Sequence, residues 1–227
     1  MKGRIVQFAA AAAALAVVAA IGIYRAGKPR LAPLAIKLPQ ATFIGTKEPI
    51  RVSNLRKLSA EERPPFLAPA GTTNVALGKP VFSSDPNPVI GEIELLTDGD
   101  KEAADGSFVE LAPSVQHVTI DLGTRHEIYA IVMWHYHKQP RVYFDVIVQT
   151  ADDPNFAANS RTLFNNDIDN SAGAGAGTDM HYLETYRGEL IDAKGIKARF
   201  VRLYSNGNST DDLNHYIEVE VYGKPAQ

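Results

Sequence analysis

The chain has 227 residues, of which 45% are apolar, and this is enough for one medium-sized domain with a real core. It contains no cysteine, which excludes disulfides, thiolate metal sites and cysteine nucleophiles. Residues 1–73 carry 11 Lys/Arg against 3 Asp/Glu, whereas residues 74–227 carry 12 against 23. Because the folded part is acidic, a nucleic acid is not expected as a partner.

The first predicted element is an apolar helix. Residues 5–24 contain one polar residue, Gln7, and basic residues flank both ends. A helix of about 20 residues is long enough to cross a bilayer core. Residues 1–25 are therefore a cleaved secretory signal or an uncleaved transmembrane anchor, and the run is longer than the roughly 7–15 residues of a signal core, which favours the anchor. Both interpretations place the rest of the chain outside the cytoplasm, in the periplasm or at the cell surface.

The next segment, residues 26–72, is predicted to be a linker because it contains seven prolines. Proline removes backbone donors and favours an extended chain, so the segment is typical of a semi-rigid spacer. It could act as a stalk that holds the domain away from the membrane. It could equally pack in part against the domain or a neighbouring subunit, and the sequence leaves both alternatives open.

From about residue 73 onward, short strands are predicted between turn residues. Residues 118–122 alternate apolar and polar, as in a half-buried strand, and residues 128–134 are apolar on both faces, as in a central strand. Further strands are predicted at 142–149, 200–204 and 216–222. No stretch predicts a long amphipathic helix. This pattern indicates an all-β sandwich or barrel.

Five short motifs in this region occur in order, at residues 74–81 (NVALGKPV), 96–100 (LTDGD), 118–123 (VTIDLG), 198–203 (ARFVRL) and 217–223 (IEVEVYG). Together they resemble the discoidin (F5/8 type C) domains of the galactose-binding-like superfamily, and the absence of paired cysteines fits the bacterial type. The resemblance implies an antiparallel jelly-roll-like β-sandwich over residues 73–227, with a ligand site in the loops at one end and no catalysis.

The same resemblance implies a structural Ca²⁺ beside the Asp-Gly loop. Asp98 and Glu218 would supply carboxylates, Asp100 a carbonyl, and Ser107 is a weaker candidate ligand. Ca²⁺ takes six to eight oxygen ligands of these kinds. The alternative is an Asp-Gly turn beside a solvent-facing glutamate.

A sugar-binding site is also expected, because a sugar needs an aromatic platform and polar groups for its hydroxyls. Such groups cluster after residue 134 and in the loop at 206–215. The candidate ligand-binding residues are His135, Tyr136, His137, Arg141, Asn206, Asn208, Asp211 and Asn214. The alternative is that Trp134 belongs to the core and that the Asn and Asp residues form turns.

The sequence contains little that indicates catalysis or a further metal site. No Gly-x-Ser-x-Gly, His-Glu-x-x-His or Walker motif is present, so an enzyme is not expected. His135 and His137 alone do not make a transition-metal site. Asp167, Asp169 and Asn170 suggest a second cation loop but lack the pattern of an EF-hand. The glycine-rich run at 173–177 follows no strand and is expected to be a surface loop.

The sequence therefore predicts a non-catalytic, extracytoplasmic module that binds carbohydrate. The alternative from another class is a structural accessory subunit of a membrane-bound assembly, which would dock a partner protein through the sandwich.

Overall fold

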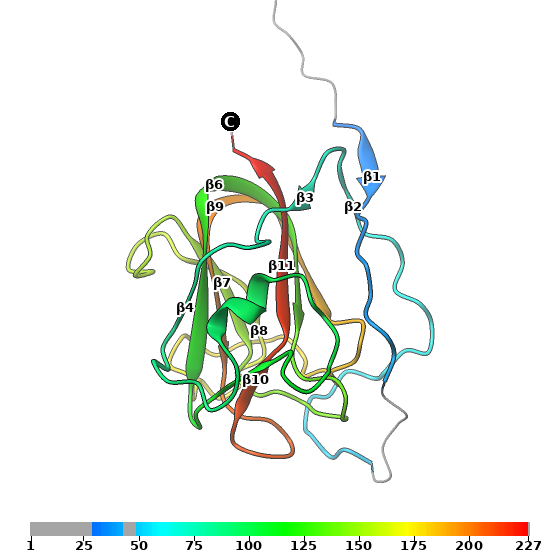
Figure 1. The fold of residues 1–227 in the computed structure, drawn as a ribbon, viewed down its shortest axis with the longest axis vertical. Helices are drawn as coiled ribbons and strands as arrows, with labels where there is room; N and C mark the ends of the chain where they lie inside the picture. Colours follow the sequence, from blue (N-terminus) through cyan, green and yellow to red (C-terminus); the bar gives the residue numbers. More distant parts are fainter. Residues whose placement is uncertain (1–28, 43–48, 227) are drawn as a thin grey trace, which may run out of the picture.

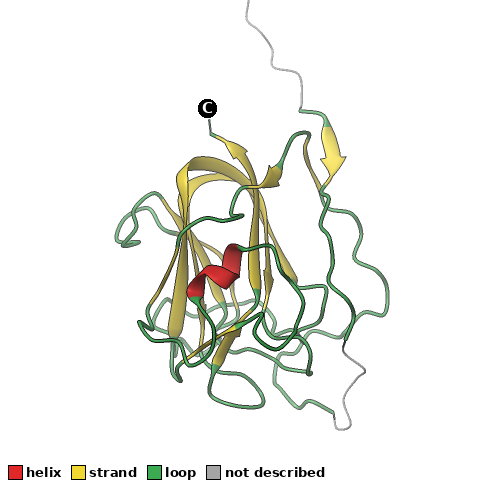
Figure 2. Ribbon diagram, in the orientation of Figure 1, coloured by secondary structure: helices red, strands yellow, loops and turns green. Residues whose placement is uncertain are grey.

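The computed structural model describes residues 29–42 and 49–226, and its ribbon is shown in Figure 1. The apolar segment predicted at residues 1–25 lies outside these ranges. Within them, no helix has the length and apolarity that crossing a membrane requires. The regular secondary structure of the described chain is almost entirely strand, with one 3₁₀ helix, η1 (Ile93–Thr97), and loops connect these elements, as Figure 2 shows. The strands are β1 (Leu31–Pro33), β2 (Leu67–Pro69), β3 (Thr73–Asn74), β4 (Val81–Ser83), β5 (Val109–Leu111), β6 (Gln116–Trp134), β7 (Ile147–Ala151), β8 (Arg161–Asn165), β9 (Glu189–Ser205), β10 (Asn214–Tyr216) and β11 (Glu218–Pro225).

Two long strands, β6 and β9, run through both layers of the molecule. The first part of β6, 116–121, pairs with 200–205 of β9, and the second part, 126–133, pairs with 189–198. The register shifts between the two parts, where Gly123 has a φ of +82° that a side chain would disfavour. Figure 1 shows both strands bending here, at the end of the molecule opposite β10.

The two halves of these strands pair with different neighbours. The first half of β6 pairs with β4, and the second half of β9 continues through β7 to β8. The second half of β6 pairs with β11, which pairs with β3 through Tyr222 and Asn74. All of these ladders are antiparallel, so the all-β antiparallel prediction is confirmed. The first and last strands of the folded region lie side by side.

The core lies between the two layers. In the first half of β6, Val118 and Ile120 alternate toward it, as the sequence pattern predicts. In the second half, the irregularity after Ile128 resets the alternation, so that Ile131 and Met133 also point inward. The intervening residues of this half point away from the core and form a second apolar cluster on the outer face. This explains why residues 128–134 are apolar on both faces.

The outer cluster is covered by the chain segment that precedes the domain. We call residues 29–42 and 49–72 the N-terminal strap; it runs along one side of the sandwich in Figure 1. Leu34, Ile36 and Phe66 of the strap pack against the cluster that contains Val132 and Trp134. The described part of the predicted linker therefore packs against the domain, which was one of the two alternatives left open by the sequence.

Polar contacts fix the strap in place. Arg56 makes a two-point ion pair with Glu189, with N–O distances of 3.0 and 2.5 Å. Arg63 donates to the backbone carbonyls of Arg187 and Gly188. A two-point guanidinium contact fixes direction as well as distance, so the strap is held in one position along β9.

Candidate functional site

Two loops meet at the end of the sandwich that holds β10, at the bottom of Figure 1. One follows β6 and the other joins β9 to β10. Their backbones are hydrogen-bonded, for example from Asn206 N to Phe144 O (2.9 Å) and from Ser209 N to Val142 O (2.8 Å). The convergence of these loops, which the sequence interpretation required, is therefore present.

A group of aromatic and charged side chains joins the two loops. Arg141 donates to Asp211 (Nη1–Oδ2, 3.0 Å), and its guanidinium lies 5.2 Å from the centroid of the Tyr136 ring. The Phe108 ring lies 5.0 Å from Tyr136 in a tilted arrangement. Both rings are partly exposed, whereas Arg141 is only 8% exposed. The arginine is therefore held rigidly between an aromatic face and a carboxylate.

His215 and Glu110 extend this group from the short sheet formed by β5 and β10, where they are register partners. His215 Nε2 lies 3.0 Å from Glu110 Oε2, and its Nδ1 lies 3.3 Å from Arg141 Nη1. We define the loop-end cluster as the six residues of this network, namely Phe108, Glu110, Tyr136, Arg141, Asp211 and His215.

Protonation follows from these contacts. Burial, together with the charge of Arg141, lowers the pKa of His215 to about 4, so the ring is neutral at pH 7. Arg141 Nη1 lies 3.3 Å from both ring nitrogens, so the Glu110 carboxylate decides the tautomer: Nε2 of His215 donates to Glu110, which leaves Nδ1 to accept from Arg141. Burial raises the pKa of Glu110, and the charge of Asp211 raises it further. Burial would also raise the pKa of Asp211, but hydrogen bonds from Asn208 and the Leu213 amide lower it overall.

The two histidines predicted to bind ligand are completely buried. His135 Nδ1 lies 3.1 Å from Glu184 Oε2, and its ring stacks on Tyr143 at 4.2 Å. Burial lowers the pKa of His135 and raises that of Glu184, so this contact is a hydrogen bond between neutral groups at pH 7. His137 contacts the carbonyl oxygen of Lys101 at 3.0 Å through Nε2. In this structure neither side chain reaches the surface.

The asparagines predicted to bind ligand form hydrogen bonds within and between the loops. Asn208 donates to Asp211 and to the Leu213 carbonyl, and its own oxygen accepts from following backbone amides. Asn214 donates to two backbone carbonyls and accepts from Gly207 N. Asn206 instead donates to Asp145 (2.7 Å). These contacts fit the alternative in which the asparagines form turns. Trp134 is likewise fully buried in the outer apolar cluster.

The proposed calcium ligands lie at a different place, where the Asp-Gly loop meets β11. Gly99 N donates to Glu218 Oε2 (3.2 Å), and Glu218 is fully buried rather than solvent-facing. Asp98 Oδ1 accepts from Asp100 N (2.7 Å) within the loop. Ser107 lies in a turn in which its amide donates to the Ala104 carbonyl.

Glu218 has a feature that fits a bound cation. Its second oxygen, Oε1, is buried and has no hydrogen-bond partner among the described residues. Burial raises the pKa of Glu218 to about 9, and the charges of Glu220 and Asp98 add to the rise. An unpaired buried carboxylate is costly, and a divalent cation would satisfy this oxygen. Glu218 and the Asp98 loop therefore fit a Ca²⁺ ion, which would tie the loop to the last strand.

A second acidic group lies beside the converging loops. Potential metal-ligand atoms of Asp145, Asp167 and Asp169 lie within 4.8 Å of one another. No other group of three or more His, Cys, Asp or Glu side chains in the described part of the chain comes so close. Ser171 Oγ donates to Asp145 Oδ2 (2.6 Å). The sequence indicated Asp167 and Asp169 but not Asp145, which follows Phe144 in a distant loop and has a φ of +50°.

Sequence reasoning also missed three members of the loop-end cluster as ligand candidates. Glu110 and His215 are 105 positions apart and meet only because β5 pairs with β10. Phe108 precedes β5, where no motif singles it out as a platform. The one available signal was that His215 ends the polar loop that starts at Asn206.

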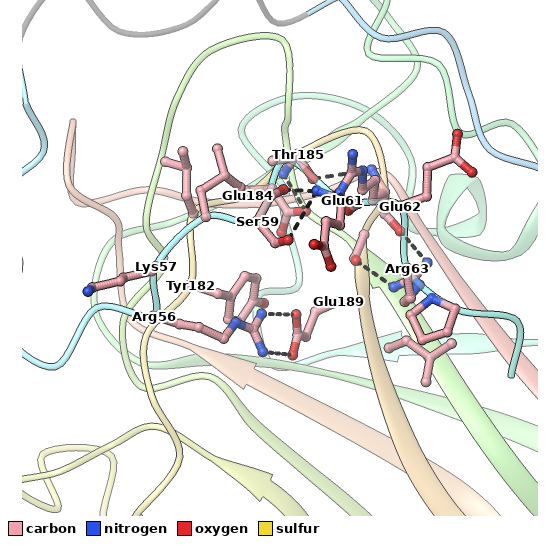
Figure 3. A pocket seen from close by; sticks show the side chains of 16 residues that line it. Arg56, Lys57, Ser59, Glu61, Glu62, Arg63, Tyr182, Glu184, Thr185 and Glu189 are labelled. Atoms are coloured by element: carbon pink, nitrogen blue, oxygen red, sulfur yellow. Dashed lines mark hydrogen bonds and ion pairs between the residues drawn. The ribbon is translucent and has the colours of Figure 1, made fainter.

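A cavity of about 330 Å³ lies under the strap, between residues 56–64 and 182–190, as Figure 3 shows. The ion pair of Arg56 with Glu189 forms one side of it, next to Tyr182. Its lining is a mixture of cations and carboxylates. No sequence pattern indicated this cavity, because one wall belongs to the segment interpreted as a linker.

No family model and no curated protein matches this chain. Among solved structures, a fucose-binding module from Streptococcus pneumoniae matches 66% of this chain and 97% of that chain, with 22% identity and a TM-score of 0.46. A chitosan-binding module from Paenibacillus matches 67% of this chain and 99% of that chain, with 18% identity and a TM-score of 0.48.

A family 89 glycoside hydrolase from Clostridium perfringens is also similar, with 19% identity and a TM-score of 0.48. That match covers 67% of this chain but only 15% of the hydrolase.

Proposed function

We propose that this chain is a non-catalytic module that binds carbohydrate, with the loop-end cluster as its ligand site. The observation that carries the proposal is the convergence of two partly exposed aromatic rings, Phe108 and Tyr136, with Arg141 and Asp211, which buried His215 holds in place from behind. A pyranose has an apolar ring face and a rim of hydroxyls. Aromatic faces take the former, and preorganised charged groups bond to the latter.

The preorganisation of the cluster supports this role. Arg141 is already paired with Asp211, and neutral His215 is held between Arg141 and Glu110. Groups that are fixed before binding lose little conformational entropy when a ligand arrives. Sugars offer few apolar contacts, so a rigid site is the more effective way to gain affinity for them.

We assign the sandwich to the jelly-roll-like discoidin class, outside the cytoplasm, with residues 1–25 as its membrane anchor or signal. Ca²⁺ is proposed as a structural ion held by Glu218 and the Asp98 loop. The similar solved structures that bind fucose and chitosan are in keeping with a carbohydrate ligand.

A glycan array probed with the full-length chain in neutral detergent tests the function, and titration of the best glycan tests the site. Replacing Tyr136 with alanine removes the platform and should weaken binding about tenfold. Tyr136→Phe is the matched control, because it keeps the ring and should bind within about twofold of the unchanged chain.

Two outcomes would contradict the proposal. If no glycan binds with or without added Ca²⁺, the carbohydrate function is wrong, and the role as a docking subunit becomes the better hypothesis. If glycans bind but Tyr136→Ala binds as tightly as Tyr136→Phe, the ligand lies elsewhere on the molecule.

A further inference from the structure

A second pocket lies near the opposite end of the sandwich, where β6 and β9 bend. It has a volume of about 510 Å³, which is within the usual range for small-ligand sites. Arg125 of the bend is nine positions before the end of β6, so the pocket lies roughly 30 Å along the strand from the loop-end cluster. The remaining walls come from the β7–β8 hairpin and from residues 196–198 of β9.

The charge of this pocket is opposite to that of the domain. Arg125, Arg161 and Lys197 line it, together with a single acidic residue, Asp152. The surrounding region, residues 74–227, carries 12 Lys/Arg against 23 Asp/Glu. A local excess of cations on an acidic domain requires an explanation beyond solubility, because it attracts negative ligands to one place.

The cations differ in how far they are neutralised. Arg125 pairs with Asp152 at 3.0 Å, with both side chains about half exposed, and Lys197 lies 3.2 Å from Glu127. Arg161 is exposed and has no ion-pair partner among residues 29–42 and 49–226. Its guanidinium is therefore available for a two-point contact with an oxyanion.

The floor of the pocket holds a buried hydroxyl without a partner. Thr150 lines the pocket and is 1% exposed, and its Oγ1 has no hydrogen-bond partner within the described chain. Thr150 shares a strand face with Val146 and Val148, which both lie in the core, so its side chain points toward the interior at this end. A hydroxyl that is buried unpaired is unfavourable, and a ligand oxygen would satisfy it.

From these observations we infer that the pocket binds the oxyanion group of a small ligand, with Arg161 and Arg125 as the charged contacts and Thr150 as a hydroxyl donor at the floor. The shared chemistry is a carboxylate, sulfate or phosphate. This site is separate from the loop-end cluster and does not depend on the carbohydrate proposal.

Isothermal titration calorimetry on the full-length chain, in neutral detergent and at constant ionic strength, tests the inference. The probes are sodium sulfate, inorganic phosphate and sodium glucuronate, with glucose as the neutral control. We expect saturable binding of at least one anion, with a dissociation constant on the order of 1 mM, and none of glucose. The arm that binds most tightly identifies a tetrahedral or a planar oxyanion.

Three variants locate the site. Arg161→Gln should weaken anion binding about tenfold, and Thr150→Val, which keeps the side-chain shape, should weaken it about threefold or more without lowering the melting temperature. Lys138→Gln removes an exposed cation outside the pocket and should leave the affinity unchanged. Absence of saturable binding, or equal losses in Arg161→Gln and Lys138→Gln, would overturn the inference, since the latter result indicates non-specific attraction to charge.

Discussion

Glu218 is a single residue that links protonation, metal binding and the position of a loop. Its pKa is raised from about 4.5 to about 9, mainly because burial disfavours the charged form. Without a cation, the carboxyl group is therefore protonated at neutral pH. Its stabilising contribution is fully present below pH 4.5 and is lost as the pH rises toward 9. A bound Ca²⁺ reverses this, because a metal ligand must be ionised.

The apparent affinity for Ca²⁺ should consequently rise with pH. Because binding displaces about one proton from Glu218, the affinity should increase about tenfold per pH unit between pH 6 and 8. Calorimetry in buffers of different ionisation enthalpy measures both the affinity and the released proton. Glu218→Gln should abolish the pH dependence and most of the binding, whereas Glu94→Gln, an exposed neighbour in η1, should change neither. An affinity that is constant from pH 6 to 8 would rule out Glu218 as a ligand.

At the scale of elements, one turn is fitted closely to the outer apolar cluster. Trp134 donates to the Tyr186 carbonyl (2.9 Å), and the turn ends at Gly188, which has a φ of +61°. A Cβ at this position would lie 2.7 Å from the indole and 2.8 Å from the Met133 carbonyl. The turn can therefore approach the sheet only with glycine at this position.

Two glycine variants separate conformational strain from steric overlap. Gly188→Ala and Gly71→Ala both place a side chain at positive φ, at a cost of about 1 kcal/mol, but nothing lies within 4 Å of the Cβ at Gly71. Gly188→Ala should lose a further 1–3 kcal/mol, roughly the cost of overpacking. Urea unfolding measures the difference, and equal losses in the two variants would show that the turn moves away without cost.

The sequence predicted local features better than distant pairings. Residues 118–122 and 128–134 were expected as two strands, and both are strands, but the structure joins them into one strand that bends at Gly123. The bend depends on pairing with β9, and no local sequence pattern predicts that pairing. Proline content predicted an extended spacer, but the described part of this segment packs on an apolar face whose residues lie 37 or more positions further along the chain.

The candidate site was likewise predictable only in part, because some of its residues meet through distant strand pairing. Tyr136, Arg141 and Asp211 meet as expected. The loops that carry them follow β6 and β9, and these two strands pair with each other. His135 and His137 were predicted to bind ligand but are buried, since the direction of a side chain after the end of a strand depends on the path of the loop. Glu110 became visible only through the register of β5 with β10.

At the scale of the whole molecule, the strap makes the domain larger than its motifs suggest. Leu34, Ile36 and Phe66 cover an apolar face that would otherwise be open to solvent. A fragment that begins at residue 73 should therefore be less stable than one that begins at residue 29, by about 3 kcal/mol for three half-buried apolar side chains. Urea unfolding measures this loss, and binding of a hydrophobic dye measures the exposed face.

Point variants within the strap provide the control for this comparison. Leu34→Ala should reproduce part of the loss, whereas Leu58→Ala, at a strap residue that is 59% exposed, should have little effect. Equal stability and equal dye binding for the two fragments would show that the strap adds nothing to the fold.

The pairing of β3 with β11 also has a kinetic consequence. Asn74 Oδ1 accepts a hydrogen bond from Val221 N across 147 positions of sequence, and β11 must enter between β3 and β6 to make it. Contacts at such separation form late, because most of the chain entropy is lost before they stabilise anything. Folding is therefore expected on the slow scale of milliseconds to seconds that is typical of β-sandwiches. Until β11 is in place, the second half of β6 keeps an unpaired edge, which is the point at which a partly folded chain is most exposed to pairing with another copy.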